Sequence, residues 1–157
     1  MDMNAFSKTL HGHYLPTNPN KVLTKGGELP AFKSKLEWKM MRYCDLNPAI
    51  LKWCYEPPFA IVPYFDKGAK KNRHYYVDFV LWVKDDTKPD KMRQIWVEIK
   101  PYEQTIPPKV KNTKRVTESQ AFNIRTYITN QCKWAAARKY CSARGFDFIV
   151  VTERELG

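Results

Sequence analysis

The amino-acid sequence predicts an α/β fold in which helices flank a mixed β-sheet. The chain has 157 residues, enough for one hydrophobic core and too few for two ordinary domains. Segments with apolar residues at helical spacing precede and follow three segments rich in β-branched and aromatic residues. The expected elements are a helix at 34–46, strands at 59–65, 74–83 and 93–100, a helix at 117–145 and a strand at 146–152. This order predicts that the last strand returns beside the others through a crossover.

The first helix is predicted from apolar side chains that recur at helical spacing. Leu36, Met40 and Tyr43 fall on one face, and Pro48 prevents the helix from continuing. The following segment, residues 48–53, is expected to add a short turn of helix.

The region before this helix is predicted to be irregular. Residues 1–32 contain glycine, proline and asparagine in quick succession, which is typical of turns and loops. We therefore expect an N-terminal arm at 1–32, followed by a single domain at residues 33–157.

The three middle strands are predicted to form an antiparallel meander, because short turn-rich segments connect them. Pro63 lies inside the first of these strands, which favours an edge position or a bulge. Residues 74–83 are predicted to form one strand.

The long helix is predicted to pack through one apolar stripe and to end at Gly145. The expected stripe is Ala121, Ile124, Ile128, Cys132 and Ala135. Gln131 lies at the border of this stripe, where it either faces a substrate or serves as a structural amide.

The net charge of the chain is +11, from 27 Lys and Arg against 16 Asp and Glu. This balance favours a polyanionic partner, most commonly nucleic acid, although a basic surface for solubility also explains it. No apolar run is long enough to cross a bilayer, so we expect an intracellular protein without a membrane partner. We expect no small-molecule cofactor.

Two basic segments, residues 67–71 and 109–115, lie on either side of the second and third predicted strands in the sequence. Lysine and arginine neutralise phosphates without reading bases, so we expect these segments to contact DNA. A charged run is also typical of a solvated loop. The expected DNA-contacting residues are Lys70, Lys71, Lys109, Lys111, Lys114, Arg115 and, from the long helix, Gln131.

Charged side chains interrupt two of the predicted strands. Asp78 lies among aromatic and β-branched residues, and Glu98 and Lys100 lie at the end of another apolar run. Because side chains alternate along a strand, Glu98 and Lys100 share a face. Asp78 joins them on that face if the two strands are neighbours.

Such a group of residues favours a bound cation. Two carboxylates about 4 Å apart repel each other by about 4 kcal/mol at an effective dielectric constant of ~20. Oxygen ligands suit Mg²⁺ or Mn²⁺, which Asp78, Glu98 and the backbone carbonyl of Ile99 would hold together with water. Lys100 would then reach the attacking water or the scissile phosphate, so the pattern indicates phosphodiester hydrolysis.

Simpler roles also explain these residues. Asp78 could form a cross-strand ion pair with Lys100 or Arg93, and Glu98 could lie at a solvated strand end. In the first helix, Glu37 has the spacing of a capping box, which explains it completely. Its catalytic alternative is a further acidic ligand supplied by that helix.

The order helix, three strands, helix and strand, with V-D-F and V-E-I-K motifs, resembles the PD-(D/E)XK nuclease superfamily and its αβββαβ core. Asp78, Glu98 and Lys100 match the motif one for one. Val77 replaces the motif's proline, and Glu37 matches the helix glutamate found in many members. The resemblance implies a catalytic role for the three motif residues and for Glu37.

Longer segments resemble the head completion nucleases of contractile-tailed phages over residues 11–156. The most specific segments are VEIKPYEQTIPPK and NQCKWAAARKYC. The resemblance implies a metal-dependent DNA nuclease, endonucleolytic or exonucleolytic, that trims packaged duplex DNA with little sequence preference before the tail joins. It also implies Mg²⁺ or Mn²⁺ as cofactor, and phage head, portal or neck proteins as partners. The expected location is the host cytoplasm during assembly, with retention in the virion neck left open.

Two other functions are compatible with the same sequence. One is a structural neck protein that binds DNA ends and needs no hydrolysis. The other is a transposon-end or junction-type endonuclease on the same fold, which would prefer a particular sequence or a branched structure.

Overall fold

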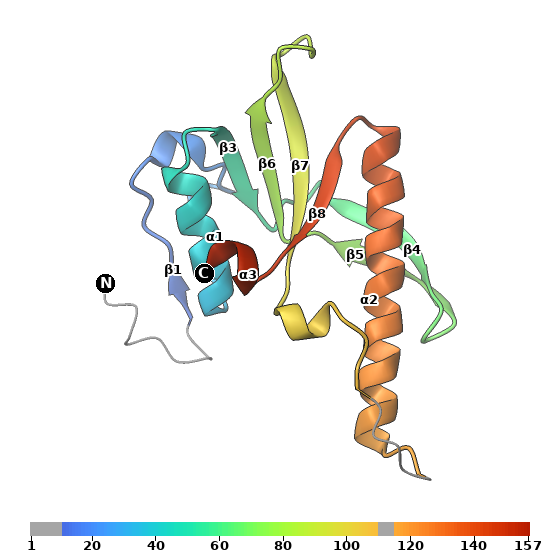
Figure 1. Cartoon of the computed structure of the whole chain (residues 1–157). Helices are drawn as coiled ribbons and strands as arrows, with labels where there is room; N and C mark the ends of the chain where they lie inside the picture. Colours follow the sequence, from blue (N-terminus) through green and yellow to red (C-terminus); the bar gives the residue numbers. More distant parts are fainter. Residues whose placement is uncertain (1–10, 110–114) are drawn as a thin grey trace.

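The computed structural model describes residues 11–109 and 115–157, with helices on both sides of a four-stranded sheet (Figure 1). The helical elements are η2 (Pro19–Lys21), α1 (Lys35–Leu46), η3 (Tyr102–Gln104), α2 (Glu118–Ala143) and α3 (Glu153–Leu156). The strands are β1 (Gly12–His13), β2 (Ala31–Phe32), β3 (Ile50–Tyr55), β4 (Ile61–Asp66), β5 (Lys71–Tyr76), β6 (Phe79–Lys84), β7 (Met92–Ile99) and β8 (Asp147–Val151). None of these helices is long and apolar enough to cross a membrane.

The main sheet has the strand order β3-β6-β7-β8. Strand β6 pairs antiparallel with both β3 and β7, whereas β8 pairs parallel with β7 and places Ile149 opposite Val97. A parallel neighbour requires a long connection, and α2 supplies it. The predicted α/β class, mixed sheet and final crossover are therefore confirmed.

The first strand of the main sheet comes from a segment that was expected to be helical. Residues 48–53 were predicted to contain a turn of helix, but most of them belong to β3. Ile50 and Trp53 pair with β6 and are buried, so pairing in the sheet decides the conformation of this short apolar run.

The hairpin β4–β5 is a separate two-stranded sheet, inserted between β3 and β6. Pro63 accordingly lies in an edge strand. The predicted single strand at 74–83 is wrong, because the chain leaves β5 at Val77 and bends at Asp78 before β6 begins. The N–H of Val77 donates to the carbonyl of Ala60, which closes the base of the hairpin.

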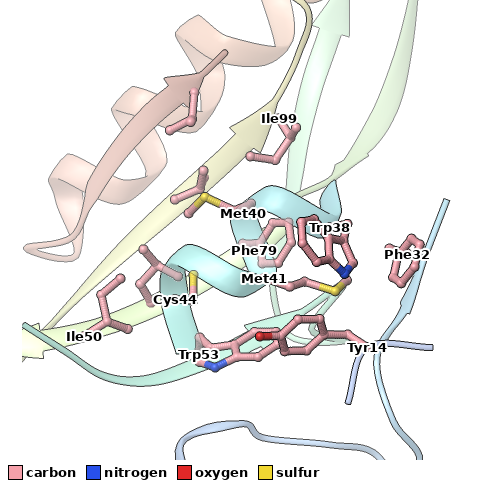
Figure 2. Close-up of a cluster of buried hydrophobic side chains, with 13 residues drawn as sticks. Tyr14, Phe32, Trp38, Met40, Met41, Cys44, Ile50, Trp53, Phe79 and Ile99 are labelled. Atoms are coloured by element: carbon pink, nitrogen blue, oxygen red, sulfur yellow. The ribbon is translucent and has the colours of Figure 1, made fainter. Parts of the chain in front are cut away.

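Helix α1 covers one face of the main sheet. Met40 and Met41 of α1 pack with Phe79 of β6 and Trp53 of β3 in one buried cluster, shown in Figure 2. Tyr14 from the N-terminal segment completes this cluster, with its ring centroid 6.0 Å from that of Trp53 in an edge-to-face arrangement. Each fully buried side chain of this size stabilises the fold by roughly 1.5–3 kcal/mol.

Helix α2 and the hairpin cover the opposite face, where Trp134 packs with Val80 and Trp96 of the sheet. Of the predicted stripe Ala121, Ile124, Ile128, Cys132 and Ala135, Cys132 packs partly buried against this core, whereas Ile128 and Ala135 are exposed, so the stripe as a whole is wrong. The buried side chains of α2 are Asn130, Trp134, Ala137 and Cys141. The first half of α2 extends beyond the sheet (Figure 1), so apolar side chains there have no strand to cover. The helix ends as predicted, with Gly145 at φ 74° directly after its cap.

The described part of the N-terminal arm is joined to α1 through Asp45. The hydroxyl of Tyr14 and the backbone N–H groups of Thr17 and Asn18 donate to the Asp45 carboxylate, at 2.6, 2.8 and 2.8 Å. Phe32, at the end of the arm, is buried in the same core as Tyr14. The division of the chain at residue 32 stays a prediction.

Candidate active site

Asp78 occupies the bend before β6, at one end of the main sheet. Its Oδ2 atom accepts a hydrogen bond of 2.8 Å from the backbone N–H of Ile99, the last residue of β7. The bond ties the start of β6 to the end of β7. The break in the predicted strand therefore directs this carboxylate toward the neighbouring strand.

Glu98 lies one residue before the end of β7 and is only 7% exposed. Its Oε2 atom accepts a hydrogen bond from the hydroxyl of Tyr75 in β5. The Nζ atom of Lys100 is 4.0 Å from the other carboxylate oxygen, Oε1. The backbone N–H of Lys100 donates to the carbonyl of Val151 in β8, so the sheet holds the chain in place around the lysine.

The two carboxyl groups influence each other strongly. The pKa of Asp78 is raised to about 8. Burial is the largest cause, and the negative charge of Glu98 is the second. A side-chain hydrogen bond with Glu98 and the charge of Glu37 act in the same direction, whereas the N–H of Ile99 opposes them. At neutral pH the pair therefore holds a proton unless another positive charge is bound.

The simpler roles considered for the pair do not match the geometry. Arg93 pairs instead with Asp147, at 2.9 Å, and with Asp85, at 3.9 Å. The ammonium of Lys100 lies beside Glu98, and Glu98 is buried rather than solvated at a strand end. These carboxylates therefore need an explanation other than a cross-strand ion pair.

Glu37 lies in the first turn of α1, and its carboxylate already has two hydrogen-bond donors. Ser34 caps the helix by accepting from the N–H of Glu37 at 3.1 Å, as the capping box predicted. The Glu37 carboxylate, however, accepts from the N–H of Lys33 rather than Ser34, and from the hydroxyl of Tyr55, at 2.7 and 2.9 Å. Across residues 11–109 and 115–157, no three His, Cys, Asp or Glu side chains gather closely enough to hold a metal. The structure therefore relates Glu37 to Asp78 only through its charge.

The donor set at Asp78 and Glu98 suits a hard divalent cation. Each carboxylate accepts one hydrogen bond through one oxygen, from Ile99 and Tyr75 respectively. Mg²⁺ is usually held by one or two carboxylates and several waters, so the half-buried Asp78 and the buried Glu98 at the strand ends fit it. A bound cation would also relieve the repulsion that raises the pKa of Asp78.

Tyr75, which is buried in the core beside α2, and Lys133 also belong to the site. The Nζ atom of Lys133 in α2 lies 5.7 Å from the centroid of the Tyr75 ring, whose hydroxyl donates to Glu98. In an unbroken strand Tyr75 and Asp78 would point to opposite faces. The bend at Asp78 changes the alternation, so a bend signal in the sequence could have placed both residues beside Glu98.

Four of the basic residues predicted to contact DNA lie on the described surface of the molecule. Lys70 and Lys71 are exposed in the β4–β5 hairpin. Lys109 and Arg115, on either side of the undescribed stretch, are also exposed. The other two predicted contacts, Lys111 and Lys114, lie outside the described residues. Contact between these residues and DNA stays a prediction.

Gln131 faces the hairpin rather than the carboxylates. It lines a surface cavity together with Phe65 and Lys67 of the β4–β5 region. Lys67 gives this surface a positive charge. A role for Gln131 in binding DNA also stays a prediction.

Comparison with known proteins assigns the chain to a family. Residues 47–153 match the TnsA-like endonuclease N-terminal domain, a range that contains Asp78, Glu98 and Lys100 but not Glu37. The chain is also 31% identical to the head completion nuclease of Enterobacteria phage T4 over 144 residues, which cover 90% of each chain. The chain belongs to the head completion nucleases. Membership in this family confirms the predicted resemblance and the mixed α/β nuclease fold, and it supports a nuclease role in phage head completion.

Proposed function

We propose that this head completion nuclease hydrolyses phosphodiester bonds of packaged DNA with the help of a divalent metal ion, Mg²⁺ or Mn²⁺. The observation that carries the proposal is the interacting pair of half-buried Asp78 and buried Glu98 with Lys100 beside it. Carboxylate pairs of this kind are unfavourable for folding alone and cluster at functional sites.

The proposed ligands of the ion are Asp78, Glu98 and the backbone carbonyl of Ile99. Such an ion, when bound, supplies Lewis-acid activation of the phosphodiester and of water. Glu37 adds negative charge near the pair, which favours cation binding, and direct ligation by Glu37 is a weaker part of the proposal.

Lys100 has a separate role in this proposal. Its side chain is 26% exposed, so the ammonium is open to a substrate while it lies 4.0 Å from Glu98. There it stabilises the negative charge that develops on the phosphate and orients the attacking water. The hydrogen bond from the backbone N–H of Lys100 to the carbonyl of Val151 holds this residue beside the carboxylates before the substrate binds.

DNA is brought to the site by the positive charge of the protein. The chain carries +11, and the exposed residues Lys70, Lys71, Lys109 and Arg115 belong to its basic segments. Contacts of this kind go to phosphates, so they imply binding with little sequence preference and a strong dependence on salt.

The cellular setting follows from the family. We propose that the protein acts in the host cytoplasm during assembly, on DNA at a filled head before the tail joins. Head, portal or neck proteins would position it there, and its retention in the virion is part of the same proposal.

The test is cleavage of linear and circular duplex DNA by purified protein with Mg²⁺ or with EDTA. We expect cleavage only with the metal, and a loss of about 100-fold or more in Glu98→Gln and in Lys100→Met. The matched controls are the exposed residues Glu28 and Lys84, whose substitutions Glu28→Gln and Lys84→Met should leave the rate unchanged. Full cleavage by Glu98→Gln would exclude the assigned site, and DNA-end binding without cleavage by the native protein would favour the structural neck protein.

A further inference from the structure

A groove of about 520 Å³ opens between the loop that follows Lys100 and the first half of α2. Glu103 and Gln104 of η3 lie on one wall of the groove, and Asn123, Tyr127 and Asn130 of α2 lie on the other. Figure 1 shows η3 and the following loop beside the part of α2 that extends beyond the sheet.

The groove begins next to the carboxylates. Along the chain, Lys100 is separated from η3 only by Pro101. On α2, Lys133 lies above the ring of Tyr75, which donates to Glu98, and Asn130 is one helical turn before Lys133. The groove and the carboxylates are therefore connected by short stretches of chain on both walls.

Asn130 is the observation that points to a ligand. Only 4% of its surface is exposed, yet its side chain lines the groove and has no hydrogen-bond partner among the residues that the structure describes. Among the described residues, the side-chain atoms that are both buried and unpaired belong to Trp53, Arg93 and Trp134, so the amide of Asn130 reaches the solvent of the groove. The amide of Asn130 is therefore available to a group that enters from the groove.

The other side chains of the groove have the chemistry that recognises nucleobases. Gln104, Asn123 and Asn130 offer amides that both donate and accept, as base edges do. Phe122, which is 61% exposed, and Tyr127 offer aromatic faces for stacking. In the described part of the chain, the charged side chains of the lining are one lysine, Lys109, and one carboxylate, Glu103.

The size of the groove restricts the form of the DNA. Its volume is within the range of about 300–1,000 Å³ typical of small-ligand sites. The bases of a double helix are stacked and paired, so they cannot enter a site of this kind without leaving the helix. Unpaired bases can enter, and proteins commonly bind such bases by stacking and by amide hydrogen bonds.

We propose that this groove binds unpaired bases of a single-stranded DNA end adjacent to the phosphodiester that is cleaved. This inference rests on the proposed nuclease function and names its substrate more closely. The preferred substrate is a DNA end with an overhang or a frayed terminus, and a blunt duplex must open before it is cut.

The binding test uses the full chain in EDTA, so that no cleavage interferes. Fluorescence anisotropy is measured with a labelled ten-nucleotide single strand and with a blunt duplex of equal length. In Phe122→Ala we expect affinity for the single strand to fall about tenfold, and in Asn130→Ala about fivefold. Affinity for the blunt duplex should change less than twofold in both variants.

Matched controls are Leu15→Ala, an exposed apolar residue, and Asn20→Ala, an exposed amide, neither of which lines the groove. Neither should change binding. Because Phe122 is exposed, the Phe122→Ala variant should have the same unfolding temperature as the native protein. Loss of the fold therefore cannot explain its result. An unchanged single-strand affinity, or an equal loss for both DNA forms, would overturn the proposal.

A second measurement separates this proposal from the nuclease function itself. The cleavage rate of an overhang substrate with Mg²⁺ is divided by that of a blunt duplex, and Phe122→Ala should lower this ratio at least fivefold. Active protein with an unchanged ratio would reject the groove and keep the nuclease. Inactive native protein whose single-strand binding depends on Phe122 would keep the groove and reject the nuclease.

Discussion

Asp45 and the Asp78–Glu98 pair are carboxylate sites of the same small protein with opposite surroundings. Three donors, from Tyr14, Thr17 and Asn18, point at the single Asp45 carboxylate, which has no exposed surface. Asp78 and Glu98 share two donors, from Ile99 and Tyr75, and face each other.

The different number of donors sets the charge of each site. Burial alone would raise the pKa of Asp45, but the hydrogen bonds from Tyr14, Thr17 and Asn18 outweigh it and lower the pKa below its usual value. At Asp78, burial and the charge of Glu98 win, and the pKa rises to about 8. A carboxylate with enough donors is part of the fold, whereas a pair with too few favours the binding of a further cation beside Lys100.

Replacing each aspartate by asparagine should affect DNA cleavage at one site and not at the other. In Asp78→Asn we expect DNA cleavage with Mg²⁺ to fall about 1,000-fold, because a ligand of the proposed ion is lost. In Asp45→Asn the rate per folded molecule should stay unchanged. Comparable losses in both variants would show that the two sites do not differ in function.

The same two variants should differ in stability. In Asp45→Asn an amide N–H faces the donors that the carboxylate accepted, and we expect a loss of about 3 kcal/mol in the free energy of unfolding. Asp78→Asn removes a repulsive charge, so its free energy of unfolding should be about 1–2 kcal/mol higher than that of the native protein at pH 8 in EDTA. Urea unfolding measures both values, and a loss of stability in Asp78→Asn would contradict the account of the pair.

The two sites should also respond to pH in opposite directions in metal-free protein. Because the folded pKa of Asp78 is raised, its stabilising contribution is present below its ordinary value and is lost as pH rises toward about 8. For Asp45 the folded pKa is lowered, so its contribution is present above its ordinary value and is lost in acid.

Thermal unfolding in EDTA at pH 5 and pH 8 tests this difference. The advantage of Asp78→Asn over the native protein should grow by about 2 kcal/mol between these pH values. The deficit of Asp45→Asn should instead stay constant over the same range and shrink only in stronger acid. A pH-independent advantage of Asp78→Asn would indicate that the site holds no extra proton.

Removal of one tyrosine hydroxyl at each site should give the smallest effects. Tyr75→Phe removes the donor to Glu98. It should raise the Mg²⁺ concentration needed for half-maximal cleavage about tenfold, since groups that orient a metal ligand change metal affinity by that amount. Tyr14→Phe should cost about 1–2 kcal/mol of stability with no change in the Mg²⁺ requirement. A Mg²⁺ titration of both variants measures the contrast, and equal shifts would contradict it.

Much of the fold could be predicted because short-range chemistry determines it. Ser34 and Pro48 bound the first helix, and Gly145 ends the long one, since caps and breakers act within a few residues. Side-chain alternation also placed Glu98 and Lys100 together at the end of one strand. For these features the chain itself contains all the information.

Other features depended on contacts between distant segments. Pairing with β6 made residues 50–55 a strand, and the inserted hairpin brought Tyr75 to Glu98. The length of the sheet, not helical spacing, decided which part of α2 is buried.

The sequence by itself determined the acidic and basic residues of the site, their spacing along the chain, and the order of helices and strands. Only the tertiary structure decided that Asp78 bends out of its strand toward Glu98 while Glu37 binds Tyr55. The physical reason is that burial and repulsion between two carboxylates arise only when segments far apart in the chain are packed together.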